Sequence, residues 1–145
     1  MPMIFETCLT KQRALKEMFV DCLTTEAKYT KIIELGQKLP QLEASYHLSE
    51  NLVEGCQSIM YLFAKTENGK MSFQIYSEAL ISRGLAALLV FIYEGEPPET
   101  LLKCPPDVIS ELGLGQTLTP GRSNGLFNLY LKMKQQALKQ IILTT

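Results

Sequence analysis

The sequence has little of what metal binding and acyl transfer require. It contains a single histidine, His47, and its four cysteines, Cys8, Cys22, Cys56 and Cys104, are far apart with no C-x-x-C pair. Structural zinc sites usually take their ligands in close pairs, so the spacing argues against a metal centre. A disulfide framework is also unexpected in an intracellular chain of this size. We therefore expect four free thiols in a reducing compartment.

Excess positive charge and long apolar runs are absent as well. The chain has 14 Lys and Arg against 15 Asp and Glu, a net charge of -1, which is a poor match to a phosphate backbone. Its most apolar window, Leu85–Tyr93, is too short to span a bilayer. Residues 1–6 show no basic segment before an apolar run, so we expect no secretory signal. The expectation is a cytoplasmic protein with neither nucleic acid nor membrane as partner, although an already removed transit peptide is an open alternative.

Length and composition favour a globular protein. The 145 residues suit one domain, residues 1–145, and are enough to bury a core. Hydrophobic residues make up 46% and charged residues 20% of the chain, which is typical of a folded domain rather than a disordered one.

Hydrophobic periodicity predicts helices that flank a single hairpin. Helices are expected over residues 10–23, 25–39, 77–93, 99–103, 107–112 and 119–142. Strands are expected over 58–65 and 71–76, because the Asn68-Gly69 pair between them suits a type I′ turn. The predicted fold class is α+β, a small antiparallel sheet packed against several helices.

Capping residues and inward faces are part of this prediction. Thr10 and Ser77 are expected to cap the first and third helices, with Glu78 at the positive end of the third. The inner face of the first helix is expected to hold Leu15, Met18, Phe19, Cys22 and Leu23. That of the last is expected to hold Leu126, Phe127, Tyr130, Met133, Ala137 and Ile141.

Five separated segments carry a resemblance to a known family. They are residues 28–29 with 32–40 (KY and IIELGQKLP), 51–58 (NxVxGCQS), 77–79 with 83–89 (SEA and RGLAALL), 112–114 (LGL) and 118–126 (LTPxRSNGL). In this order the chain resembles the SufE-type sulfur acceptors of iron–sulfur cluster biogenesis, over about residues 18–138. That family implies a SufE/IscU-like fold. Three positions depart from its pattern: Tyr61 stands where Trp is frequent, Tyr76 where Asp is frequent, and Gly121 where Ser is common.

The resemblance implies the chemistry of Cys56. In this family a cysteine desulfurase of the SufS type offers a persulfide, and the acceptor cysteine takes its terminal sulfur, stimulates the desulfurase and passes the sulfur to a SufB-containing scaffold complex. The chain would then need no resident cofactor, would carry sulfur on Cys56, and would not be an independent catalyst. A free cysteine has a pKa of about 8.5, so its thiolate needs help at neutral pH.

Four further residues are candidates for support or partner contact. Gly55 gives the cysteine loop the backbone freedom that presenting a thiol requires. Gln57 follows the cysteine and either supports the loop or simply enters the strand. Glu78 and Arg122 lie in the matched segments, and Arg122 is a remote source of positive charge, because the nearest ionisable neighbour, Glu54, is acidic.

Three other functions stay open at this point. A cysteine hydrolase would need His47 as its base. An IscU-like iron–sulfur scaffold or zinc protein would need about three grouped thiolates. A module that activates the desulfurase without taking sulfur would need no reactive thiol. Among the other cysteines, Cys22 is expected in the core, Cys104 in partly buried loop packing and Cys8 in a mobile terminus.

Overall fold

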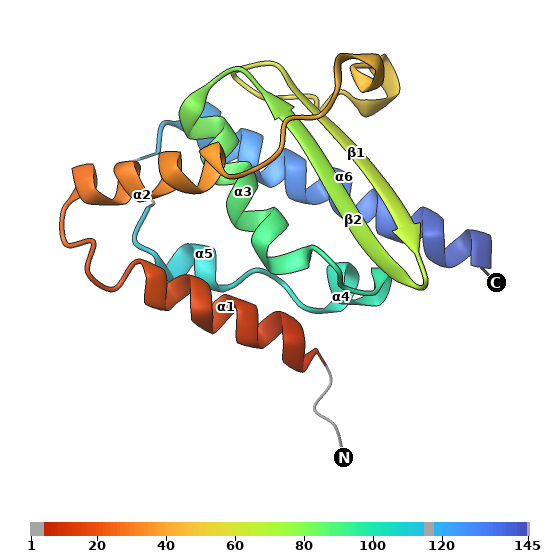
Figure 1. Cartoon of the computed structure of the whole chain (residues 1–145), viewed down its shortest axis with the longest axis horizontal. Helices are drawn as coiled ribbons and strands as arrows, with labels where there is room; N and C mark the ends of the chain where they lie inside the picture. The colour runs from red at the N-terminus through yellow and green to blue at the C-terminus, as the bar shows by residue number, and fades with distance from the viewer. Residues whose placement is uncertain (1–4, 115–117, 145) are drawn as a thin grey trace.

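The computed structural model describes residues 5–114 and 118–144 and confirms an α+β fold (Figure 1). Its elements in chain order are α1 (Glu6–Met18), α2 (Thr25–Gln37), two short 3-10 turns (Ala44–Tyr46 and Ser49–Asn51), β1 (Met60–Glu67), β2 (Lys70–Ser77), α3 (Leu80–Tyr93), α4 (Pro98–Lys103), α5 (Val108–Glu111) and α6 (Pro120–Thr144). Residues 1–4, on which part of the signal-sequence expectation rests, lie outside the described residues. None of the helices in the described ranges combines the length and apolarity needed to cross a membrane.

The sheet is one antiparallel hairpin, as predicted. Its register runs from Met60 opposite Ser77 to Glu67 opposite Lys70. Asn68 and Gly69 both have positive φ, 54° and 77°, which confirms the type I′ turn. Both strands alternate buried and more exposed residues along most of their length, so one face of the hairpin covers the core.

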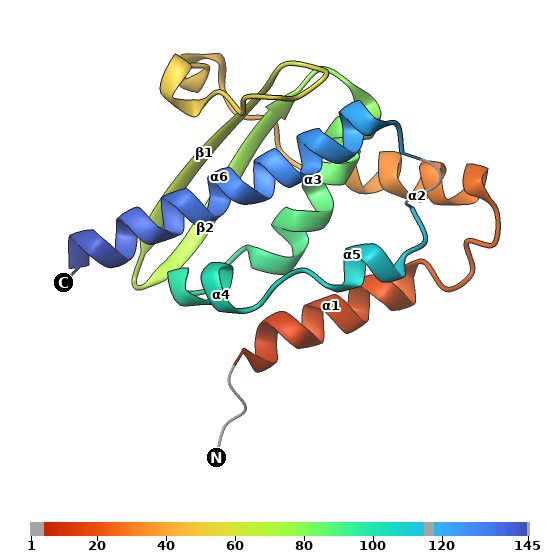
Figure 2. The same ribbon diagram turned by 180° about the vertical axis from the view of Figure 1, so that it is seen from behind.

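Helix α3 is the centre of the molecule. Most of its length is buried, including Leu88, Ile92 and Tyr93. It lies against the hairpin and α2, and in Figure 2 helix α6 crosses over both α3 and β1. Gly95, with φ 79°, follows its end as expected. This three-way packing explains why residues 85–93 are apolar nearly all round.

The first helix differs from the prediction. It covers Glu6–Met18 instead of 10–23, so Thr10 is an interior residue and no cap. Met18 is 37% and Leu23 87% exposed, so neither belongs to the inner face. The buried face consists of Cys8, Gln12 and Leu15. Gln12, at the centre of this face, is polar, so the apolar residues alone do not show the helical spacing. The sequence pattern therefore placed the start of the helix too late.

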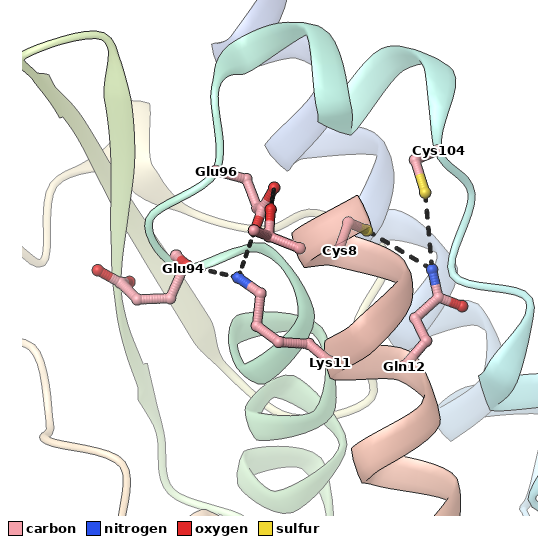
Figure 3. A network of polar contacts seen from close by, with 7 residues as sticks. Cys8, Lys11, Gln12, Glu94, Glu96 and Cys104 are labelled. Carbon is pink, nitrogen blue, oxygen red and sulfur yellow. Dashed lines mark hydrogen bonds and ion pairs between the residues drawn. The ribbon is translucent and has the colours of Figure 1, made fainter. Parts of the chain in front are cut away.

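Gln12 is buried, and its side-chain nitrogen and oxygen both have partners. Figure 3 shows the nitrogen between the sulfurs of Cys8 and Cys104. Gln12 Nε2 donates to the carbonyl of Pro105 at 3.1 Å and contacts the sulfurs of Cys8 and Cys104 at 3.6 and 3.8 Å. Its Oε1 accepts from the backbone N–H of Val108 at 3.1 Å. These contacts fix α1 to residues 104–108. Cys8 is therefore fully buried, and its expected place in a mobile terminus is wrong.

Two smaller predictions are also wrong. Ser77 is the last residue of β2, while Ala79 stands at the N-cap of α3 without a side-chain hydrogen bond. Strand pairing with Met60 extends β2 into the region assigned to the helix cap. In α6, Phe127 is 63% exposed and Leu129 is fully buried in its place. Of the expected inner face, Met133 and Ala137 are confirmed as buried, and Leu126, Tyr130 and Ile141 are partly buried.

Candidate functional site

Cys56 lies on a short loop that is fixed at its base. The backbone N–H of Val53 donates to the carbonyl of Met60 at 2.9 Å, and Leu52 forms an isolated antiparallel bridge with Tyr61. Residues 54–59 project between these two points. Gly55, just before the cysteine, has φ 78°, a conformation that residues with a side chain rarely adopt. The local reason for glycine at this position is thus the left-handed turn that directs Cys56 toward α6.

The loop packs on the first turns of α6 through close backbone approaches. The sulfur of Cys56 lies 3.8 Å from the carbonyl oxygen of Gly125. A Cβ on Gly125 would lie 3.4 Å from that sulfur, which is ordinary contact, whereas one on Gly55 would overlap the amide of Asn128. The close fit between loop and helix therefore requires the absence of a side chain at Gly55.

Gln57 makes a second contact with the start of α6. Its Oε1 accepts a hydrogen bond from Thr119 Oγ1 at 3.3 Å. A Cβ on Gly121 would lie 2.6 Å from the same Oε1. Gln57 is thus a loop residue held in the groove that Gly121 leaves open, and it is not part of β1.

The thiol of Cys56 faces a small cavity between the loop, α3 and α6. The space open to a water-sized probe is about 10 Å³, roughly one water molecule. Most of the lining is apolar, with Ser82 and Arg122 contributing polar groups. The lining residues are Cys56, Gln57, Met60, Ser82, Leu85, Ala86, Gly121, Arg122, Gly125, Leu126 and Leu129.

Burial of Cys56 raises its pKa above the ordinary value of a cysteine. Arg122 reaches the same cavity, yet its guanidinium forms no ion pair or hydrogen bond with another described residue. Its backbone N–H donates to Thr119 Oγ1 at 3.3 Å, which supports the start of α6. In this arrangement the thiol is protected and protonated at neutral pH instead of being activated.

The structure does not place Glu78 at the cavity. Its side chain is exposed and accepts a hydrogen bond from the hydroxyl of Tyr76 at 3.1 Å. Tyr76, one of the departures from the family pattern, therefore contacts Glu78 directly. Of the residues selected from the sequence, Cys56, Gly55, Gln57 and Arg122 gather at the loop and α6, while Glu78 lies outside this group.

His47 is held in an aromatic cluster and does not line the cavity of Cys56. Its Nε2 lies 2.9 Å from the carbonyl oxygen of Leu42. Its ring stacks on Tyr61, with centroids 4.8 Å apart, and contacts Tyr76 at 4.2 Å. A cysteine hydrolase would need this imidazole on the thiol. The geometry therefore gives no support to a Cys–His pair.

Metal ligands are also scattered. Across residues 5–114 and 118–144, no three His, Cys, Asp or Glu side chains come together in a way that could hold a metal ion. The described cysteines are unpaired, and Cys8 and Cys104 lie at Gln12, on another part of the molecule from Cys56. An IscU-like scaffold site would require ligands beside Cys56 that these residues do not provide.

Sequence reasoning missed three residues that shape the site, Ser82, Gly125 and Asn128. Gly125 lies in a segment that had been singled out for its family pattern, and Ser82 lies between the two matched parts of another. The approach of Gly125 to Cys56 and the place of Ser82 in the cavity follow only from the packing of α3 and α6. Asn128 lies beyond those segments and gave no signal of its own.

Comparison with known proteins identifies the family of the chain. The SufE family, described as the Fe-S metabolism associated domain, matches residues 13–137. The chain belongs to the SufE family. A role in iron–sulfur metabolism follows from this membership.

Relatives of this SufE-family chain occur in plants and bacteria. It is 34% identical over 129 residues to SufE-like protein 1, chloroplastic/mitochondrial, of Arabidopsis thaliana, covering 88% of this chain but only 35% of that protein. It is 34% identical over 111 residues to an uncharacterized SufE-like protein of Synechocystis, covering 77% of this chain and 70% of the relative. An uncharacterized SufE-like protein of Rhizobium etli is 36% identical over 117 residues, with 77% and 79% covered.

A solved structure shares the fold. The solution structure of a hypothetical protein from Thermus thermophilus superimposes with a TM-score of 0.75 at 28% identity, covering 91% of this chain and 96% of that one. The match over nearly all of both chains shows that the arrangement of hairpin and helices described above recurs in another protein.

Proposed function

We propose that this SufE-family chain is a sulfur carrier that receives sulfane sulfur from a cysteine desulfurase on Cys56. The observation that carries the proposal is the setting of this thiol: it is half-buried on a short loop, beside a cavity about the size of one water molecule. A terminal sulfur atom is only slightly larger than a water molecule. The loop and cavity can therefore shelter a persulfide, whereas no base or metal ligand set lies among the described residues there to support hydrolysis or cluster binding.

The transfer is an exchange between two thiols and one sulfur atom. The thiolate of Cys56 attacks the terminal sulfur of the desulfurase persulfide, and a new S–S bond forms as the S–S bond of the donor breaks. The electron pair leaves with the desulfurase thiolate, so no external oxidant or reductant is needed. Removal of the sulfur regenerates the desulfurase cysteine, which explains how a carrier would stimulate that enzyme without being a catalyst itself.

The raised pKa of Cys56 supports a mechanism in which the thiol is activated in the complex. A buried thiol with a raised pKa supplies little thiolate at neutral pH, and thiolate fraction limits exchange. Docking on the desulfurase would draw Cys56 out of the cavity and so remove the effect of burial on its pKa. Arg122 lines the same cavity, so it is our candidate for a positive charge that stays close to the thiol when the loop leaves the cavity. The sulfur then passes to an iron–sulfur scaffold of the SufB-containing type.

Unpaired cysteines fit a reducing compartment, and we place the carrier in the cytoplasm. In this proposal the chain binds no resident cofactor, and the sulfur on Cys56 is cargo. It meets the desulfurase and the scaffold through protein contacts and uses neither nucleic acid nor membrane.

Mass spectrometry of the intact protein tests the proposal. After incubation with a SufS-type desulfurase and free cysteine, we expect the protein to gain sulfur, about 32 Da per atom, located on the peptide that contains Cys56. Cys56→Ser should abolish the gain, whereas Cys22→Ser, which changes another half-buried cysteine, should keep it. Full stimulation of the desulfurase by Cys56→Ser would contradict the carrier and favour a module that activates the enzyme without taking sulfur.

A further inference from the structure

We propose that Gln57 is a positioning residue that keeps the Cys56 loop closed by seating its amide in a notch at the start of α6. The notch exists because Gly121 has no side chain. The importance of this contact for sulfur transfer rests on the proposed function, but the contact itself concerns only the free protein.

The notch is defined by two independent contacts. Thr119 Oγ1 donates to Gln57 Oε1 at 3.3 Å. A Cβ on Gly121 would lie 2.6 Å from that oxygen and 3.2 Å from the Cβ of Gln57, both closer than such atoms normally approach. With its amide in this position, Gln57 leaves no room for a side chain at 121, so a larger residue there would displace the amide. Gln57 as a whole is an exposed residue, and the bond from Thr119 holds its amide at the start of α6.

The position of Gln57 determines that of its neighbour Cys56. With the amide in the notch, the adjacent thiol points into the cavity and lies 3.8 Å from the carbonyl oxygen of Gly125. Without it, the loop keeps its fixed base at Val53 and Met60 but loses one of its attachments to α6. The contact thus controls how often the thiol is exposed, and it is separate from the chemistry of the thiol.

Gly121→Ala separates this role from a general effect on stability. Gly121 lies in the first turn of α6, and its φ is not in the left-handed region, so alanine suits its backbone. We expect the unfolding midpoint of Gly121→Ala to be unchanged or higher. The same methyl group fills the notch and displaces Gln57. The variant should therefore be at least as stable as the wild type while its Cys56 is less protected.

Alkylation of the free protein by iodoacetamide at neutral pH, followed on the Cys56 peptide by mass spectrometry, tests the proposal. We expect Gln57→Ala and Gly121→Ala to react about fivefold faster, as the loss of one neutral hydrogen bond implies. The midpoint of the pH profile of this reaction should also fall in both variants, because an exposed thiol loses the effect of burial. Ser123→Ala, an exposed change in the same turn of α6, should behave as the wild type.

The rate at Cys22 serves as an internal reference. Unchanged Cys56 rates in both variants, with the fold intact, would overturn the proposal. Equal acceleration at Cys22 and Cys56 would also overturn it, because it would show general unfolding. Sulfur uptake is measured separately with a desulfurase. If the wild type gains no sulfur, the carrier function is rejected, while the alkylation result still stands. If both variants are alkylated and take up sulfur at the wild-type rate, only the role of Gln57 is rejected.

Discussion

Gly36 and Gly84 meet backbone to backbone where α2 crosses α3. A Cβ on Gly36 would lie 2.7 Å from the backbone nitrogen of Gly84, and one on Gly84 would overlap the carbonyl of Ile32. Both glycines are buried, so the crossing has no space for a methyl group. This approach brings α2 against the central helix and thereby sets the position of α3, whose Ser82 lines the cavity of Cys56.

Gly84→Ala should therefore destabilise the protein despite the better helix propensity of alanine. Overpacking of this kind costs about 1–3 kcal/mol, measured as a loss in the free energy of unfolding by urea. Leu80→Ala, at a 54% exposed position on the same helix, should change it by less than about 1 kcal/mol. A wild-type midpoint for Gly84→Ala would show that α2 can move away from α3 at little cost.

Gly55, the residue before Cys56, should be equally sensitive, for two reasons that can be separated. Gly55→Ala places a side chain at φ 78° and against Asn128, whereas Gly95→Ala meets the same backbone strain at φ 79° with nothing within 4 Å. The strain is expected to cost about 1–2 kcal/mol in both. Gly55→Ala should cost more in urea unfolding, and Asn128→Ala should recover part of the difference. Equal losses in the two glycine variants would mean that the loop does not press on α6.

The reactivity of Cys56 should depend on pH in the direction set by burial. Since burial raises its pKa, the rate of alkylation in the free protein should reach half its maximum above about pH 8.5, the value of a free cysteine. Addition of a SufS-type desulfurase whose own cysteine is replaced by serine should lower this midpoint. A midpoint in the complex that stays at the free-protein value would place activation elsewhere than in the docking step.

Arg122→Ala tests the one basic side chain among the described residues that line the cavity. We expect it to slow sulfur uptake from the desulfurase about tenfold, as the loss of one charged contact in the complex implies, while urea unfolding changes little. Arg122→Lys should retain part of the rate, because the positive charge is kept. Unchanged uptake and unchanged affinity for the desulfurase in Arg122→Ala would limit this residue to packing at the start of α6.

The buried thiol of Cys8 should weaken the fold at alkaline pH. Burial, and then a hydrogen bond with Cys104, raise the pKa of Cys8 to about 12. The unfolded thiol has a pKa of about 8.5, so its contribution to stability is complete below that pH and is lost as the pH rises toward the folded value. The free energy of unfolding should fall over this range by up to about 1.4 kcal/mol per pH unit. Cys8→Ala should flatten the slope, and Cys22→Ala should keep it.

Local signals in the sequence were sufficient for much of the fold. The Asn68-Gly69 turn and the start of α2 at Thr25 follow from short-range chemistry, and both are confirmed. The α+β class follows from the order of the segments. The start of α1 was missed because Gln12, a polar residue, is buried by partners that are remote in sequence, namely Pro105 and Val108.

The candidate site was predictable only in part. Cys56, Gly55, Gln57 and Arg122 were selected from matched segments, and they lie together. Their contacts were not predictable, because they depend on how α6 approaches the loop. The same approach decides which face of α6 is buried, so Leu129 and not Phe127 points inward. The cavity forms where the Cys56 loop, α3 and α6 pack together, and the spacing of residues in the sequence does not predict this packing.

The fixed base of the cysteine loop has a consequence for leakage of sulfur. With Val53 joined to Met60 and Leu52 to Tyr61, opening involves residues 54–59 and leaves the hairpin intact. Loop motions of this size take nanoseconds to microseconds, whereas enzyme turnover is typically about 1–1000 per second. In the proposed carrier, a loop of this kind would open many times in each transfer cycle. Small cellular thiols would meet a sulfur carried on Cys56 only in these openings, so its lifetime should scale inversely with the fraction of time that the loop is open.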